Sequence, residues 1–206
     1  LEFNKVNPYS VLDDYPYQLM GGKAWPLNSG SAKYQGHLTL REALRQSLNT
    51  VAVRLMIDYV TPEESFKFIQ DRYHIDLEEG RMVYGEWKTD ITNSLAMGGL
   101  TDGTNVRDMA EAYATFPNQG YYKDSRTVVK ITQLVDGQEV TLVDNTVEPE
   151  KVIKDTTAWY MNDMMQGVFT GAGTASGRAK ELKRVHAAGK TGTTSDNNAR
   201  WFVGYT

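Results

Sequence analysis

The 206-residue chain contains no cysteine. This absence excludes disulfides, cysteine zinc sites and a thiol nucleophile. Histidine is scarce too, and the three residues His37, His74 and His186 share no spacing typical of metal ligands. The sequence therefore predicts neither a metal site nor a cofactor site, and any chemistry has to come from hydroxyl, amine, amide and carboxylate groups.

Positive charge is not in excess, and long hydrophobic runs are missing. The chain has 22 Lys and Arg against 26 Asp and Glu, a net charge of −4, which argues against nucleic acid as a partner. The most apolar helical run, 50–60, is interrupted by Arg54 and Asp58 and is too short to span a membrane. The hydrophobic share of 40% and the charged share of 23% are typical of a globular domain with a core.

Two helical start signals stand out in the first half of the chain. Residues 1–36 carry many prolines and glycines and are predicted to be loop-rich. Residues 37–120 are predicted to be mostly helical, with Thr39 opening one helix as a capping residue. Thr61 followed by Pro62 opens another in the same way.

The second half combines strands with one helix. The segment 127–144 is predicted to be a β-hairpin, because two apolar stretches flank the turn signal Asp136-Gly137. Residues 155–206 are predicted to form a helix and then two strands, near 184–193 and 200–205. Runs of helices with separate antiparallel strands favour an α+β fold, in which helices pack on a mainly antiparallel sheet.

A Lys-Thr-Gly triplet, Lys190-Thr191-Gly192, lies in the first of these two strands. On a strand, such a triplet can bind a substrate carboxylate, because the ammonium and hydroxyl groups face the ligand and the glycine lets it approach the backbone. The competing interpretation is a phosphate loop around the same lysine, but that motif requires glycine where Arg184 stands. A dinucleotide loop at 171–176 is rejected, because a helix rather than a strand precedes it.

The Lys-Thr-Gly triplet belongs to a serine acyl-transfer signature that also contains Ser-x-Asn. One copy, Ser47-Leu48-Asn49, lies between two predicted helices, in the order that the signature requires. Its structural alternative is helix capping by Asn49. The second copy, 195–197, follows the triplet directly, and Ser, Asp and Asn are residues that turns prefer in any case. We therefore prefer the first copy.

With these motifs the sequence resembles the transpeptidase domain of bifunctional, or class A, penicillin-binding proteins. The resemblance extends over roughly 8–206. The segments that carry it are Leu40–Leu44 with Ser47–Val53, Ser94–Gly99 with Met109–Phe116, Ala158–Met165 with Gly171–Ala175, and Ala188–Thr194 with Trp201–Thr206.

The resemblance implies acyl transfer on the D-Ala-D-Ala end of a peptidoglycan stem peptide, and acylation of the same serine by β-lactams. It implies that Ser47 relays a proton, that Asn49 binds the substrate amide, and that Lys190 sets the electrostatics of Ser47. It also implies that Thr191 and Thr193 hold the substrate carboxylate beside Gly192, with the backbone N–H of Thr193 as an oxyanion-hole donor.

One motif of the family is missing. The nucleophile signature Ser-x-x-Lys occurs at none of the nine serines. We therefore expect a partial transpeptidase domain over 1–206, truncated at both ends, and inactive alone. The parent protein is expected to be anchored at the extracytoplasmic face of the bacterial membrane, and a truncated sheet edge is expected to allow self-association. The alternative is a scaffold domain that naturally lacks catalysis.

Overall fold

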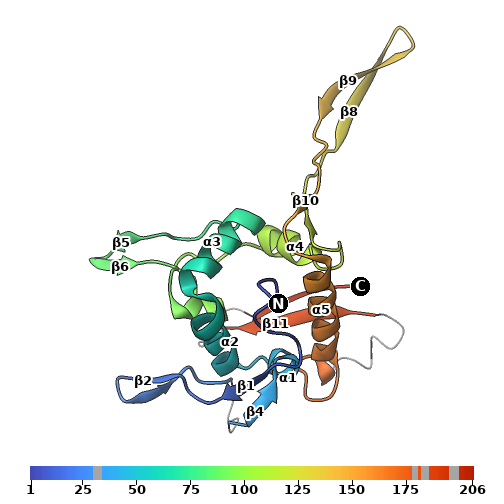
Figure 1. Ribbon diagram of the computed structural model, residues 1–206. Helices are drawn as coiled ribbons and strands as arrows, with labels where there is room; N and C mark the ends of the chain where they lie inside the picture. Colours follow the sequence, from blue (N-terminus) through green and yellow to red (C-terminus); the bar gives the residue numbers. More distant parts are fainter. Residues whose placement is uncertain (30–33, 178–180, 182–185, 195–199) are drawn as a thin grey trace.

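The structure, a computed structural model, describes residues 1–29, 34–177, 181, 186–194 and 200–206. Its helices are α1 (Leu40–Gln46), α2 (Asn49–Leu55), α3 (Pro62–Tyr73), α4 (Val106–Ala114) and α5 (Asp155–Gln166). The structure also contains a π-helical turn η1 (Met56–Val60) and the 3₁₀ turns η2 (Asn93–Met97) and η3 (Gly167–Phe169). Figure 1 shows these elements along the chain.

The strands form short antiparallel pairs. The pairs are β1 (Val11–Asp14) with β4 (Gly36–Thr39), β2 (Gln18–Met20) with β3 (Lys23–Trp25), β5 (Arg81–Val83) with β6 (Glu86–Lys88), β7 (Tyr121–Tyr122) with β10 (Glu150–Lys151), β8 (Lys130–Val135) with β9 (Gln138–Asp144), and β11 (Ala188–Thr193) with β12 (Arg200–Tyr205). Helices beside antiparallel strands confirm the predicted α+β class.

The first 36 residues contain more strand than the sequence suggested. Strands β1, β2 and β3 all lie there, and the stretch around residue 85 holds the β5–β6 hairpin. These strands have three or four residues each. Such lengths are too short to produce the alternating pattern from which strands are recognised. The Pro and Gly signals marked the turns between them correctly.

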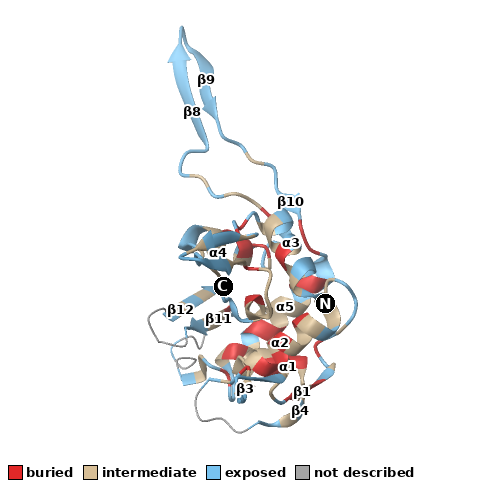
Figure 2. Ribbon diagram, turned by 90° about the vertical axis from the view of Figure 1, so that its left-hand side faces the viewer, coloured by how far each residue is buried: buried red, intermediate tan, exposed pale blue. Residues whose placement is uncertain are grey.

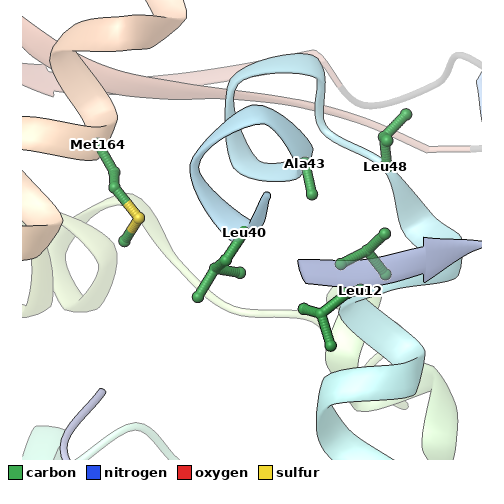
Figure 3. Close-up of a cluster of buried hydrophobic side chains, with 6 residues drawn as sticks. Leu12, Leu40, Ala43, Leu48 and Met164 are labelled. Atoms are coloured by element: carbon green, nitrogen blue, oxygen red, sulfur yellow. The ribbon is translucent and has the colours of Figure 1, made fainter. Parts of the chain in front are cut away.

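Helix α1 anchors one of the two hydrophobic clusters. The hydroxyl of Thr39 accepts a hydrogen bond from the backbone N–H of Glu42 at 3.3 Å, which confirms the predicted cap. Figure 3 shows how side chains from β1, α1, the corner after α1 and α5 face one another. The buried members of this cluster are Leu12, Leu40, Ala43, Leu48, Val51 and Met164. The cluster thus fixes α1 and the start of α2 against α5.

A second cluster holds α3 and α4 together. Thr61 accepts a hydrogen bond from the backbone N–H of Glu64 at 3.2 Å, and Pro62 stands in the first turn of α3, as predicted. The buried members are Met56, Phe66, Ile75, Leu77, Leu95 and Ala112. Val51 on α2 belongs to the first cluster and Met56 on η1 to the second, so the α2–η1 segment connects the two.

The predicted hairpin at 127–144 is present as β8 and β9. Asp136 and Gly137 both have positive φ, 51° and 77°, as the two-residue turn between twisted strands requires. The hairpin projects far from the body in Figure 1 and is exposed along its whole length in Figure 2. It therefore contributes nothing to the two buried clusters.

Glu111, on α4, ties the base of this hairpin to the body. Its buried carboxylate accepts hydrogen bonds from the backbone N–H of Ser125 at 2.7 Å, the guanidinium of Arg107 at 2.8 Å and the hydroxyl of Tyr122 at 3.0 Å. Burial raises the pKa of Glu111, but these hydrogen bonds outweigh it and lower the pKa to about 2.

This arrangement predicts acid sensitivity. A depressed pKa in the folded state contributes stability that is complete above pH 4.5, the ordinary value, and is lost as the pH falls towards 2. The contribution is at most about 3 kcal/mol. We expect Glu111→Gln to lower the free energy of unfolding in urea at pH 7 and to flatten its decline between pH 4.5 and 2. Glu139→Gln, on exposed β9, is the control, and an unchanged pH slope in Glu111→Gln would contradict the prediction.

Strands β11 and β12 pack beside α5 and α4. Six residue pairs run from Ala188 with Tyr205 to Thr193 with Arg200. A Cβ on Gly189 would lie 2.8 Å from the carbonyl oxygen of Val203 and 2.9 Å from the ring of Phe202, so only glycine fits there. Across the part of the chain that the structure describes, no helix is long and apolar enough to cross a membrane.

Candidate active site

Ser47 lies at a sharp corner between α1 and α2. It adopts the left-handed conformation, φ 59° and ψ 49°, and its backbone N–H bonds back to the carbonyls of the last turn of α1. A residue other than glycine is rarely found in this conformation, and such residues cluster at functional sites. The next residue, Leu48, is buried in the cluster of Figure 3. Its burial holds the corner in place.

A buried polar network supports the start of α2. Asp14 and Thr50 are fully buried, and the hydroxyl of Thr50 donates to the carboxylate of Asp14 at 2.5 Å. The same carboxylate accepts from the side chain of Asn28 at 2.6 Å and from the backbone N–H of Gln35 at 2.8 Å. Asn28 in turn accepts from the backbone N–H of Thr50 at 3.2 Å. The network therefore locks the residue that follows Asn49.

Asn49 itself is the first residue of α2. It caps nothing, because Leu48 is the capping position and makes no side-chain cap. The capping interpretation of Asn49 is thus wrong. Its side-chain NH₂ group donates to the carbonyl of Leu27 at 2.8 Å, which fixes the orientation of the carboxamide. Asn49 and Lys190, both described, form no hydrogen bond with each other.

Lys190 reaches Ser47 across 143 positions of sequence. Its Nζ donates to the Oγ of Ser47 at 2.6 Å and to the carbonyl of Thr191 at 2.8 Å. Burial lowers the pKa of Lys190, because the charged amine loses hydration there. A larger fraction of Lys190 is therefore neutral at a given pH than for an ordinary lysine, which suits an amine that exchanges protons with a neighbouring hydroxyl.

Of the other residues in the triplet region, Thr191 has the clearest contact. Its Oγ1 lies 2.6 Å from the Oγ1 of Thr174, in the loop before β11. Gly192 and Thr193 are exposed at the end of β11. The structure thus joins Ser47, Lys190 and Thr191, places Asn49 next to that group through the α1–α2 corner, and leaves Thr193 open to solvent.

The secondary structure disagrees with both nucleotide-binding interpretations, the phosphate loop at Lys190 and the dinucleotide loop at 171–176. Lys190 sits inside strand β11, whereas the lysine of a phosphate loop precedes a helix. The 171–176 stretch follows the helical segment formed by α5 and η3, which agrees with rejecting a dinucleotide loop. The second Ser-x-Asn copy, 195–197, and Arg184 lie outside the described residues. Among the residues that are described, no group of three His, Asp or Glu side chains could hold a metal.

A family model described as the penicillin binding protein transpeptidase domain matches residues 1–206. The chain belongs to this family. The resemblance drawn from the motifs is therefore confirmed.

Relatives of this transpeptidase chain agree. It is 31% identical over 222 residues to Penicillin-binding protein 1A/1B of Bacillus subtilis (strain 168), covering 100% of this chain and 22% of that protein. The chain thus spans about a fifth of the length of the curated relatives that it matches.

Two solved structures share the fold of the transpeptidase chain. One is Penicillin-Binding Protein 1A from Haemophilus influenzae, with a TM-score of 0.72, 23% identity, and coverage of 97% of this chain and 33% of that one. The other is the D,D-transpeptidase domain of a peptidoglycan glycosyltransferase from Eggerthella lenta, with a TM-score of 0.70, 23% identity, and coverage of 98% and 53%.

Two contributors to the site were missed by sequence reasoning. The sequence places Thr174 only within Gly171–Ala175, one of the segments that resemble the transpeptidase family, and Asp14 is one acidic residue in a segment predicted to be loop-rich. The signal for Thr174 was available, since a threonine directly after Gly171-Ala172-Gly173 stands in a backbone turn that is tightly constrained. Asp14 could not be found from the sequence, because its three partners lie 14, 21 and 36 residues away.

Proposed function

We propose that this chain is part of a serine D,D-transpeptidase that cross-links peptidoglycan stem peptides and is acylated by β-lactams. The observation that carries the proposal is the 2.6 Å contact between Nζ of Lys190 and Oγ of Ser47 in a member of the transpeptidase family. The name of the Eggerthella lenta structure, a D,D-transpeptidase domain, supports it.

In the proposed reaction, a serine from outside this chain attacks the carbonyl between the two D-Ala residues. The C–N bond breaks, the terminal D-Ala leaves as the amine, and an ester to the serine remains. An amine of a neighbouring strand then attacks the ester and releases the serine. Ser47 relays the proton of the attacking serine to the leaving amine, and in the second step it relays a proton of the attacking amine back to the serine oxygen. Lys190, through its hydrogen bond, sets how readily Ser47 gives up and regains these protons.

The remaining residues bind the substrate. Asn49 has its NH₂ group on the Leu27 carbonyl, which orients its carboxamide for the substrate amide. Thr191 and Thr193 bind the terminal carboxylate beside Gly192, where the absence of a side chain leaves room. The backbone N–H of Thr193 supplies an oxyanion-hole donor. Neither a metal nor a cofactor is needed for these steps.

The wider setting is part of the same proposal. The parent protein is anchored in the bacterial plasma membrane and works on its extracytoplasmic face, where peptidoglycan is found, and its partners are stem peptides and β-lactams rather than nucleic acid. Within the described residues, β11 and β12 pair only with each other, and Phe202 on β12 is 55% exposed. The free edges of this pair are the proposed route to self-association of the isolated chain.

Intact mass with and without penicillin tests the proposal. The 206-residue chain is expected to gain no mass, because Ser-x-x-Lys is missing from it, and the full-length parent is expected to gain one penicillin. An adduct on the short chain would make one of its own serines the nucleophile, Ser47 foremost, and would overturn the role of Ser47 as a relay. A full-length parent that never acylates would favour the non-catalytic scaffold instead.

A further inference from the structure

The loop before β11 touches both halves of the site. The backbone N–H of Thr174 donates to the carbonyl of Arg45 at 3.3 Å, in the last turn of α1, two residues before Ser47. The side chain of Thr174 meets that of Thr191 at 2.6 Å. One residue therefore links the helix that carries Ser47 with the strand that carries Lys190 and Thr191.

The part of this loop next to Thr174 is held by backbone hydrogen bonds. The backbone N–H of Gly173 donates to Thr170 at 2.8 Å, and that of Ala175 donates to Val168 at 3.0 Å. A Cβ on Gly173 would lie 2.2 Å from the carbonyl oxygen of Val168, so the loop can pass there only as glycine. The hydroxyl of Thr174 is thus presented to Thr191 by a backbone that has little freedom to move away.

The direction of the hydrogen bond between Thr174 and Thr191 determines whether the Thr191 hydroxyl can donate to a substrate carboxylate. A hydroxyl has one proton to donate and can also accept. To bind a carboxylate, Thr191 has to donate its proton to that carboxylate, and its oxygen is then free to accept from Thr174. A chain of hydroxyls oriented in this way is polarised along its length, which strengthens the terminal donor.

We propose that Thr174 is a positioning residue for carboxylate recognition, and that it donates to Thr191 and so turns the Thr191 proton toward the terminal carboxylate of the acyl donor. The proposal rests on the proposed transpeptidase function. It adds a residue that acts through Thr191. Thr174 is exposed beside the site, so its replacement leaves the buried clusters intact.

The test compares two penicillins on the full-length parent protein. Thr174→Val keeps the shape of the side chain and removes the donor. We expect it to slow acylation by benzylpenicillin about tenfold, because the hydrogen bond from Thr191 to the charged carboxylate is weakened. Acylation by the methyl ester of benzylpenicillin, which has no free carboxylate, is expected to change less than about twofold. Thr174→Ser, which keeps the hydroxyl, is expected to restore the wild-type ratio.

Thr170→Val is the matched control in the same loop. The hydroxyl of Thr170 donates to the carbonyl of Gly167 at 3.0 Å, within its own turn, so its loss should not distinguish the acid from the ester. The proposal is overturned if the wild type acylates but Thr174→Val slows acylation by both penicillins equally, or slows neither. A wild type that does not acylate at all would overturn the proposed function, and this proposal with it.

Discussion

Replacing Lys190 with methionine is expected to slow acylation of the full-length parent by penicillin at least 100-fold. Methionine is unbranched and of similar volume, but it has no N–H group. The 2.6 Å hydrogen bond from Lys190 to the Oγ of Ser47 is therefore lost. Proton transfer by a positioned side chain contributes roughly 10² to 10⁴ in rate. The measurement is the second-order rate constant of acylation, followed with a fluorescent penicillin.

The pH profile separates a proton-exchanging role from a merely structural one. Because burial lowers the pKa of Lys190 below its ordinary value of 10.5, the neutral amine is present at lower pH than for a free lysine. The wild-type rate constant is therefore expected to rise with pH through a midpoint below 10.5. Lys190→Met is expected to lose this rise, whereas Lys130→Met, on the exposed β8 strand, keeps it. A profile that is the same in all three proteins would contradict the role of Lys190.

Asp14→Ala is expected to cost the isolated chain about 3 to 5 kcal/mol of unfolding free energy. The carboxylate is fully buried and accepts three hydrogen bonds, from Thr50, Asn28 and the backbone of Gln35. Alanine leaves the fully buried hydroxyl of Thr50 without this acceptor, at the desolvation cost of a buried polar group. It also removes the hydrogen bonds from the half-buried side chain of Asn28 and from the backbone of Gln35. Urea unfolding at pH 7, followed by circular dichroism, measures the loss.

Asp13→Ala is the matched control for Asp14. Asp13 is the preceding residue on β1, on the opposite face of the strand, and pairs at the surface with His37. Exposed ion pairs contribute roughly 0 to 1 kcal/mol, so the control should lose no more than that. Equal losses in the two variants would show that the network around Thr50 does not stabilise the start of α2. Asp14→Asn, which can keep part of the network, is expected to fall between them.

The local signals in the sequence predicted local structure well. Each of these signals specifies a structure within a few residues of chain, and each structure is found where it was expected. They are the helix starts at Thr39 and at Thr61 with Pro62, and the hairpin turn at Asp136-Gly137. The three-residue strands were missed, since a pair such as β2 and β3 is stabilised by its partner strand rather than by its own pattern. The capping role given to Asn49 is wrong because α2 begins at Asn49 itself, which puts Leu48 at the capping position. The side-chain NH₂ group of Asn49 instead donates to a carbonyl 22 residues upstream, that of Leu27.

The sequence alone determined the family and its motifs, because Lys190-Thr191-Gly192 and Ser47-Leu48-Asn49 are each contiguous and appear in the order of the signature. The identity of the groups that touch was decided only by the tertiary structure. Lys190 meets Ser47 across 143 positions, Thr174 meets Thr191 across 17, and Thr50 meets Asp14 across 36. Such contacts depend on how α1 and β1 pack in one hydrophobic cluster and on how β11 packs against α5. Packing is a property of all these segments together, which no single stretch of sequence encodes.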